Sequence, residues 1–360
     1  MIKKFDLYII KKFLGTFAFI IIMFVFIIIV FDVSEKIDDF INKKAPLNLI
    51  ITQYYLNFIP SFLSSFGPLF AFLSVVFFTS KLALKTEVIA FLSNGISFNR
   101  FLRPYLISSI FLCLLNIYLN NFVIPKANYG KLEFENKYIK NIYRNNKRNI
   151  HSQIEPGKFV YFSNFDNLNY VGYNFSLEKF DGQKLKYKLI SDVIRWDTAK
   201  QTWNIVNYYT REIKDNKEII KTGYSLDTVI NNLNIGDFTK RETTVETLNF
   251  FELRDFIKNE KLKGSEGIAY YEIEFYKRFS FPIATILLTL IGLSISNRKI
   301  RGGLGIHLTI GIILGFFYIL LIQISTTFAL YSSLSPFISV WIPNVIYLFI
   351  SIFMLRFAQK

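Results

Sequence analysis

The stretch FLGTFAFIIIMFVFIIIVF, residues 13–31, contains no charged side chain. Its 19 residues come close to the ~20 that an apolar helix needs to cross the roughly 30 Å hydrocarbon core of a bilayer. Basic residues precede it, as they do in a signal peptide. The run is too long for a signal-peptide core, however, and no small-residue cleavage site follows it. The stretch therefore predicts a membrane-spanning helix.

Further apolar runs predict five more crossings. Residues 46–80, 104–125 and 279–297 contain no charge, and residues 302–355 contain no Lys, Arg, Asp or Glu over a length that holds two crossings, at about 304–328 and 337–355. We expect Pro60 or Gly67-Pro68 to kink the second helix, and residues 32–44 to form a polar loop after the first. With 52% hydrophobic residues and a mean hydropathy of +0.32 over 360 residues, the chain is predicted to be an α-helical polytopic membrane protein. Six transmembrane helices would lie in a 3+3 layout around a polar insert.

The insert, residues 126–263, has the composition of a β domain. Runs such as KFVYFSNF, LNYVGYNFSLEKF, KLKYKLISDVIRW and TWNIVNYYTREI are rich in Val, Ile, Tyr, Phe and Thr, as strands are. Turn signals separate them, at Asp181-Gly182, Asp197-Thr198 and Asp215-Asn216. This spacing predicts an antiparallel sandwich or jelly roll, with helices at 126–148 and 247–263. We expect three domains: residues 1–125, the β-rich domain 126–263, and residues 264–360.

The distribution of charge predicts the orientation in the membrane. The chain carries a net charge of +15, of which only +4 lies between Lys126 and Lys277. The rest lies in short segments beside apolar runs, so it favours membrane orientation over nucleic-acid binding. With both termini in the cytoplasm, the inner segments would hold most of these cations: Lys3, Lys4, Lys11, Lys12, Lys81, Lys85, Arg100, Arg103, Arg298, Lys299, Arg301, Arg356 and Lys360. The insert would then face outward, into the periplasm of a Gram-negative bacterium.

A short basic segment, KLALKTEVIAFLSNGISFNRFLR at residues 81–103, separates the second and third crossings. Leu84, Val88 and Phe91 are spaced as one face of a short helix. Thr86-Glu87 suits its start, and Asn94-Gly95 suits its end. Such a helix lies at a membrane surface, as an ordinary connector, or docks into another protein.

Motifs of catalysis are missing from the sequence. There is no GxxxxGK[ST] phosphate loop, GxSxG elbow or HExxH pair. His151 and His307 are far apart, and the single Cys113 lies in an apolar run. The sequence thus predicts no catalytic residue, metal site or cofactor. The glycines of Arg301-Gly302-Gly303-Leu304-Gly305 indicate a tight turn into a helix, and Gly311 with Gly315 forms a GxxxG pair typical of close helix packing, although such pairs also arise by chance.

Several motifs resemble the LptF/LptG (YjgP/YjgQ) permeases of lipopolysaccharide export, over nearly the whole chain but weakly in the insert. The matching segments are Phe5-Asp6-Leu7-Tyr8-Ile9 with Lys11-Lys12-Phe13, Thr86-Glu87-Val88-Ile89 through Ser93-Asn94-Gly95-Ile96-Ser97, Arg301 to Leu308, Gly315-Phe316-Phe317-Tyr318, and Trp341-Ile342-Pro343-Asn344. Leu7 stands where that family usually has Arg, so the contacts of that arginine are not transferred. The motifs do not distinguish the LptF role from the LptG role.

The resemblance implies a permease subunit of an ABC-type transporter that extracts lipopolysaccharide from the inner membrane and passes it to a periplasmic bridge. Its expected partners are a cytoplasmic LptB-like ATPase dimer, a sister LptF or LptG subunit, an LptC/LptA-like bridge protein and lipopolysaccharide. It implies coupling to the ATPase through Thr86, Glu87, Val88, Phe91 and Gly95. Outward cations would contact the lipid phosphates, and Lys36, Lys43 and Lys44 are the short-loop candidates. The alternative is that these lysines lie in a solvated loop and only offset the charge of its acidic residues.

Two other classes of function stay open at this point. A membrane scaffold or mechanotransmitter would couple a cytoplasmic ATPase to a periplasmic partner without moving lipid, but it usually has its outward domain after the first crossing. A membrane enzyme acting on lipid would need an acid/base or nucleophile cluster near a crossing, and the sequence offers none.

Overall fold

The computed structural model describes residues 3–140, 148–214, 217–239, 242–265, 267–300, 303–332 and 334–358. These residues form two compact units. A helical unit contains Met1–Ile139, Glu246–Phe250 and Ala269–Lys360, and a β unit contains Lys140–Val245 and Phe251–Ile268. The predicted turn at Asp215-Asn216, the Arg301-Gly302 pair and Lys360 lie outside the described residues.

The first half of the helical unit contains long helices interrupted by two π-helical turns. Its elements are α1 (Lys4–Asn42), α2 (Leu47–Leu49), the π-helix η1 (Ile50–Tyr55), α3 (Leu56–Leu84), α4 (Glu87–Ser93), α5 (Phe98–Tyr118), the π-helix η2 (Leu119–Val123) and α6 (Ile124–Tyr138). The second half contains α9 (Ile268–Ser296), α10 (Gly303–Tyr331) and α11 (Pro336–Ala358). Six helices among the described residues are long and apolar enough to cross a membrane. This confirms the predicted layout of three and three.

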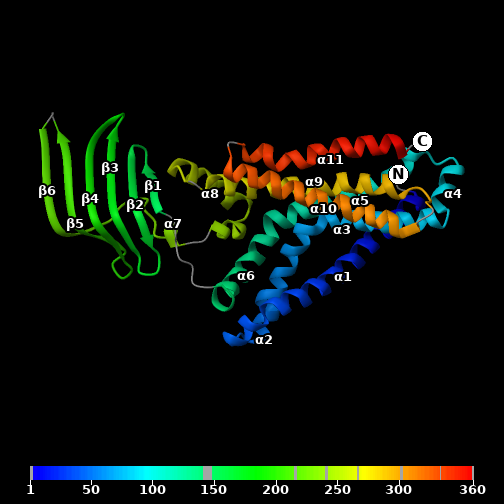
Figure 1. Cartoon of the computed structure of the whole chain (residues 1–360), viewed down its shortest axis with the longest axis horizontal. Coiled ribbons are helices and arrows are strands. Elements are labelled where there is room, and N and C mark those ends of the chain that lie inside the picture. The colour runs from blue at the N-terminus through cyan, green and yellow to red at the C-terminus, as the bar shows by residue number, and fades with distance from the viewer. Residues whose placement is uncertain are drawn as a thin grey trace. The chain divides into compact units, whose positions relative to one another are not determined.

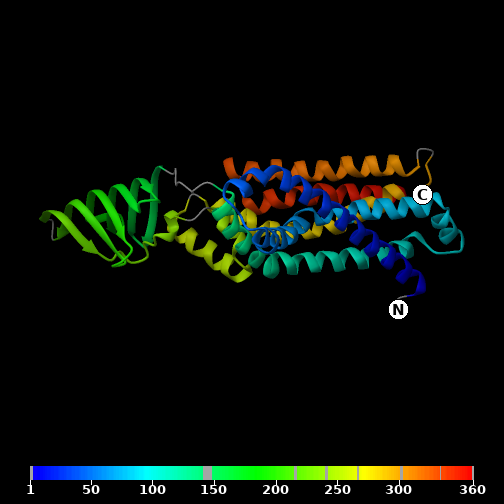
Figure 2. The ribbon, with the colours of Figure 1, turned by 90° about the horizontal axis from the view of Figure 1, so that it is seen from below.

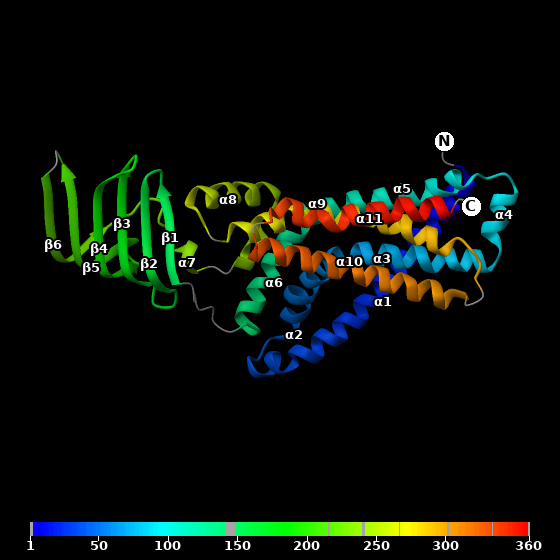
Figure 3. The same cartoon turned by 45° about the horizontal axis from the view of Figure 1, so that its top comes forward.

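The bundle core forms where these helices present aromatic and aliphatic side chains to one another. One cluster joins α1, α3, α4 and α5 around Phe13, Phe78 and Tyr105. A second joins α3, α9, α10 and α11 around Phe72, Tyr318 and Tyr347. Both termini and α4 lie at one end of the unit, whereas α2 and the C-terminal end of α6 lie at the other (Figures 1 and 3). Figure 2 again shows the N- and C-termini near the same end.

The sequence prediction of a polar loop at residues 32–44 was wrong over most of its length. Helix α1 continues through these residues to Asn42. Its polar continuation is stabilised by an ion pair between Asp32 and Lys36, one helical turn apart. The predicted helix at 126–148 also differs, because α6 begins at Ile124, directly after the third crossing, and ends at Tyr138. Residues 141–147 of that prediction lie outside the described residues.

The β unit contains one antiparallel sheet in which each strand pairs with its neighbour in sequence (Figure 1). The strands are β1 (Arg148–Glu155), β2 (Lys158–Asp166), β3 (Val171–Asp181), β4 (Lys184–Asp197), β5 (Thr202–Lys214) and β6 (Lys217–Thr228). Short helices follow at α7 (Gly236–Thr239), the 3-10 helix η3 (Glu242–Thr247) and α8 (Phe250–Lys263). The predicted antiparallel β domain is confirmed. Among the described strands, however, it is a single six-stranded sheet and not the two packed sheets of a sandwich.

One face of this sheet carries the core of the β unit. Phe162, Phe165 and Trp203 are almost fully buried there, and Phe238 of α7 packs on them. The predicted turns also occur, because Gly182 has φ of +60° and Asp197 accepts backbone N–H bonds from Ala199 and Lys200. The sequence runs that we quoted correspond to β2–β5. Strand β6 was not among them, because it is exposed along nearly its whole length and so lacks an apolar alternation.

The predicted division into residues 1–125, 126–263 and 264–360 stays a prediction about which segments fold independently. In the structure, residues 126–139 and 246–250 pack with the helical unit.

Candidate functional site

The segment between α3 and α5 forms a short helix with defined ends. Thr86 has φ of +60° and precedes α4, and Gly95 has φ of +82° and follows it. The amides of Gly95 and Ile96 bond back to the carbonyls of Leu92 and Phe91, which confirms the predicted glycine stop. The hydroxyl of Thr86 donates to the Lys85 carbonyl and makes no cap bond to α4.

The two faces of α4 have different surroundings. Val88 is 1% exposed in the bundle core, and the Phe91 ring lies 4.8 Å from that of Phe5, centroid to centroid. Leu84 does not share this helix, because it is the last residue of α3. On the other face, Ile89 and Leu92 are 55% and 39% exposed. The outward apolar pair of α4 is therefore Ile89 and Leu92, whereas Val88 and Phe91 hold α4 on the bundle.

Sequence reasoning missed Ile89 and Leu92 because it followed a single apolar stripe through Leu84. Their own spacing of three positions was the available signal, since residues three apart share a helix face. Of the five residues predicted for coupling, Glu87 is half-buried and Gly95 is exposed. Thr86, exposed as well, lies at the junction of α3 and α4.

Polar contacts join α4 and α5 to the start of α1. The Tyr8 hydroxyl donates to the Glu87 carboxylate at 3.0 Å. Two guanidinium nitrogens of Arg100 donate to the two carboxylate oxygens of Asp6 at 2.5 and 2.6 Å. The backbone N–H of Lys3 also donates to Asp6. Such a bidentate pair fixes direction as well as distance, so α1 is held firmly against the segment that carries α4.

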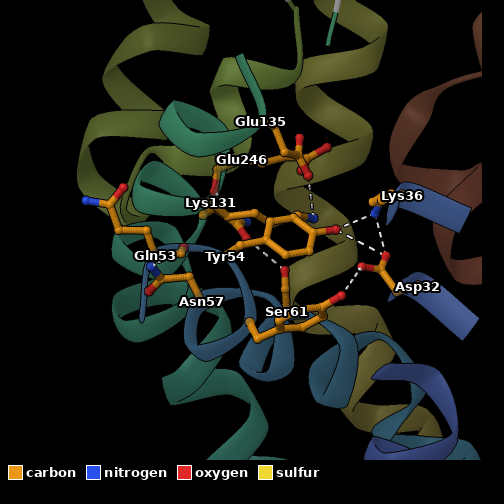
Figure 4. A network of polar contacts seen from close by, with 11 residues as sticks. Asp32, Lys36, Gln53, Tyr54, Asn57, Ser61, Lys131, Glu135 and Glu246 are labelled. Atoms are coloured by element: carbon orange, nitrogen blue, oxygen red, sulfur yellow. Dashed lines mark hydrogen bonds and ion pairs between the residues drawn. The ribbon is translucent and has the colours of Figure 1, made fainter. Parts of the chain in front are cut away.

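At the other end of the unit, a buried carboxylate organises a second network (Figure 4). Asp32 is 7% exposed and accepts hydrogen bonds from the hydroxyls of Tyr54 and Tyr55, each at 3.1 Å. Lys36 donates to both Asp32 and Tyr54, and its ammonium lies 4.9 Å from the centroid of the Tyr54 ring. These contacts join α1 to η1.

The Lys36 ammonium also lies 5.8 Å from the centroid of the Phe58 ring of α3, and a second lysine, from α6, approaches that ring. The ammonium of Lys131 lies 5.3 Å from the centroid of the Phe58 ring and 3.5 Å from the Glu135 carboxylate. The network thus joins α1, η1, α3 and α6 through positive, aromatic and negative groups. Each charge in it has a partner.

The three lysines predicted to contact lipid differ in their surroundings. Lys36 is enclosed by Asp32 and Tyr54 and lies within α1, not in a loop. Lys43 is exposed and its ammonium donates to the carbonyl of Ile139 at 3.1 Å. Lys44 is exposed with φ of +51° at the turn after α1. All three lie in or just after the C-terminal part of α1. Of the three, only Lys43 and Lys44 have exposed side chains.

A polar pocket of about 240 Å³ lies within the helical unit and is lined by residues of both of its halves. Its walls include Ser64 of α3, whose hydroxyl oxygen lies 2.8 Å from the side-chain carbonyl oxygen of Asn116 and 2.7 Å from that of Asn120. Arg278 of α9 is 4% exposed, donates to the Leu248 carbonyl at 2.8 Å and lies 3.8 Å from Glu274. Ionisable groups that are buried among membrane helices need such partners, because an isolated charge is costly there.

His307, one of the two histidines of the chain, takes part in the helix packing. It is 2% exposed, and its Nδ1 lies 2.8 Å from the Ser80 hydroxyl of α3. Gly311 and Gly315 of the GxxxG pair face Val76 and Leu69 of α3, so this pair packs helices within the chain. Across the described ranges, no group of three or more His, Cys, Asp or Glu side chains is placed to hold a metal ion.

Comparison with known families gives one match of nearly full length. The family described as lipopolysaccharide export system permease LptF/LptG matches residues 7–356. A comparison with curated proteins gives no match. The family match covers both halves of the helical unit, the β unit and every motif from Leu7 to Asn344. The chain belongs to the LptF/LptG family of lipopolysaccharide export system permeases.

Proposed function

We propose that the chain is the membrane subunit of an ATP-driven transporter that extracts lipopolysaccharide from the inner membrane. A separate LptB-like ATPase dimer would supply the energy, a sister LptF or LptG subunit would complete the membrane part, and an LptC/LptA-like bridge protein would receive the lipid. The observation that carries the coupling part of this proposal is α4. It presents Ile89 and Leu92 outward beside Glu87, outside the six crossings.

The exposed face of α4 fits a hydrophobic groove on a protein partner. A helix of seven residues is too short to be stable alone, and here Val88 and Phe91 fix it to the bundle. A rigidly held helix face loses little entropy on docking. Movement of the ATPase would pass through α4 to α1 by way of Tyr8–Glu87 and to α5 by way of the backbone.

We further propose that both termini and α4 are cytoplasmic and that the β unit is periplasmic. The support is that the termini and α4 share one end of the helical unit (Figure 3), and that basic residues accumulate in these segments. Protease added to intact spheroplasts should then cut within residues 126–263 and spare residues 81–103. Protection of residues 126–263 from the protease would contradict the proposed orientation.

The function itself is tested by co-purification from native membranes. We expect the full chain to bring down an ATPase, a second permease and lipopolysaccharide. Recovery of an ATPase without lipopolysaccharide would favour the scaffold or mechanotransmitter. Recovery of lipopolysaccharide without an ATPase would contradict the proposed energy source.

A further inference from the structure

A groove of about 420 Å³ opens between α1 and α3. It is lined by α1 residues between Tyr8 and Phe19 and by Phe77 of α3. This part of α1 belongs to the end of the helical unit that carries the N-terminus (Figure 1). The groove is therefore distinct from the network around Asp32 and from Lys43 and Lys44, which lie at the far end of α1.

The groove carries positive charge. Lys11 and Lys12 line it and are exposed, and its lining, as far as the chain is described, contains no carboxylate. The Lys12 ammonium lies 5.7 Å from the centroid of the Tyr8 ring. The Glu87 carboxylate, which accepts a hydrogen bond from Tyr8, lies outside this lining and keeps its own negative charge, so the two lysines still leave a net positive charge here. The two ammonium groups together offer an anion up to six N–H donors.

Beyond the lysines the groove becomes apolar. Phe19 lies seven residues after Lys12 and eight after Lys11 on α1, a separation of roughly 11 Å at 1.5 Å per residue. It is 63% exposed, and Phe77 forms the facing wall. Exposed apolar residues continue the same face of α1 at Ile22 and Phe26. The order along the helix is thus cation first, then an open apolar track.

Space at the middle of the groove is unoccupied by protein. A Cβ built at Gly15 meets no atom within 4 Å. Lys81 of α3 lies one turn beyond Phe77, toward the same end of the unit, and is exposed. It adds a third cation on this side of the molecule. A diacyl lipid with a negative headgroup matches this arrangement. Its phosphate would lie at the cationic end of the groove, and its acyl chains would follow the apolar residues beyond.

We propose that this groove binds an anionic glycerophospholipid, with the phosphate on Lys11 and Lys12 and one acyl chain along Phe19 and Phe77. Basic pockets between membrane helices select anionic headgroups. The bound lipid would be a structural or regulatory ligand and not cargo, since it occupies the opposite end of α1 from the lysines proposed to contact lipopolysaccharide.

Native mass spectrometry of the full-length protein in detergent tests this, with phosphatidylglycerol as the probe and phosphatidylcholine as the neutral comparison. We expect the wild type to prefer phosphatidylglycerol. Lys11→Gln/Lys12→Gln should weaken its binding at least tenfold, whereas Lys217→Gln/Lys221→Gln, the same charge change on β6, should not. Gly15→Leu keeps both lysines but fills the groove, so it should weaken binding as well, with Gly15→Ala as its milder control.

Each contrary result overturns the proposal. If Gly15→Leu binds like the wild type while the lysine variant does not, the lysines act only as diffuse surface charge. If both variants bind like the wild type, the groove holds no anionic lipid. If lipopolysaccharide, and not phosphatidylglycerol, is the lipid lost from the variants, the groove belongs to the cargo path. Thermal unfolding of each variant shows whether it remains folded, and the exposed lysine pair is the variant expected to tolerate change best.

Discussion

The Tyr8 hydroxyl donates a hydrogen bond to the Glu87 carboxylate at 3.0 Å and joins α1 to α4 across 79 positions of sequence. This bond changes the chemistry expected of Glu87. One carboxylate oxygen is engaged within the chain, whereas the other has capacity for a cation of a partner protein. Glu87 can therefore serve both as a tie to α1 and as an anchor for an ATPase.

Substitution at Glu87 separates these two roles. Glu87→Lys should release the ATPase from the purified permease at unchanged permease levels, because a like-charge contact at an interface costs several kcal/mol. Tyr8→Phe removes only the internal bond and should retain the ATPase. Glu87→Gln keeps the hydrogen bond and should show an intermediate loss. The measurement is the ATPase-to-permease ratio after affinity purification.

The contrary outcomes are distinct. If Glu87→Lys retains the ATPase normally, the anchoring role is wrong. If Tyr8→Phe releases the ATPase as strongly as Glu87→Lys does, the essential contact is the internal one. An acidic substitution on the ATPase that restores binding to Glu87→Lys would identify its partner side chain.

The crossings could be predicted from the sequence because charge-free runs of sufficient length have few other stable environments. The glycine stop of α4 was equally predictable, since Gly95 adopts the positive φ that other residues disfavour. The continuation of α1 through residues 32–42 was not. It depends on Asp32 finding two tyrosine hydroxyls, and tertiary partners of this kind leave no local pattern.

The same limit applies to the candidate sites. Asp6 and Arg100 are 94 residues apart in sequence, and neither stands in a motif that names the other. The lysines predicted to contact lipopolysaccharide were selected as loop residues. Lys36 instead lies in a helix and forms an ion pair with the Asp32 carboxylate. Sequence pattern identified which segments matter, whereas side-chain pairing decided which residues in them are available.

The difference among the three lysines gives a second prediction. Lys43→Gln/Lys44→Gln should reduce the lipopolysaccharide that co-purifies with the complex, with ATPase association unchanged. A charge-assisted hydrogen bond contributes roughly 1.5–3 kcal/mol, so the loss of two should be readily measured. Lys36→Gln alone should have a smaller effect on lipid, because its ammonium is already paired with Asp32. Lys217→Gln/Lys221→Gln supplies the control for net charge, and unchanged lipid retention in the Lys43/Lys44 variant would leave these lysines as solvated loop charges.

Asp32 provides a complementary test of that network. Asp32→Asn should leave Lys36 without its ion-pair partner and the two tyrosine hydroxyls with a weaker acceptor. We expect the thermal midpoint of the purified protein to fall, because losing one member of a buried charge pair leaves the other uncompensated. Asp38→Asn, the same change at an exposed position of α1, is the matched control. Equal midpoints for the two variants would contradict a structural role for the Asp32 network.

The GxxxG pair of α10 predicts asymmetric effects of substitution. A Cβ at Gly311 would lie 3.4 Å from the nearest atom of Val76, an ordinary contact, so Gly311→Ala should be nearly neutral. Gly315 is closer to α3, because a Cβ there would collide with the end of the Leu69 side chain. Gly315→Ala forces the Leu69 side chain to move and should therefore cost more stability than Gly311→Ala. Gly315→Leu places a full side chain against α3 and should destabilise by about 1–3 kcal/mol, the usual cost of overpacking. Thermal unfolding in detergent measures both, and equal tolerance at the two sites would contradict direct packing of Gly315 on α3.

The last prediction concerns acid and the exposed edge of the sheet. Strand β6 pairs only with β5 in the described sheet, and hydrogen bonds from Arg211 hold the pKa of Glu218 below its ordinary value. A hydrogen bond from Asn204 and the nearby Lys200 likewise lower the pKa of Asp227. Because these pKa values are lowered in the folded state, the stabilisation is present above the unfolded values of about 4. It is lost as pH falls through the lowered folded values.

Acid should therefore loosen β6 before the buried strands. Hydrogen exchange of the full-length protein, corrected for the pH dependence of the chemical rate, should show faster exchange in β6 at pH 3 than at pH 6, with little change in β2 and β3. Arg211→Gln removes the guanidinium that Glu218 prefers when ionised, so β6 should exchange faster already at pH 6 and respond less to acid. Arg195→Gln, the same replacement at an exposed position of β4, should behave like the wild type. If Arg211→Gln responds to acid as fully as the wild type does, the Arg211–Glu218 pair is not the source of the pH dependence.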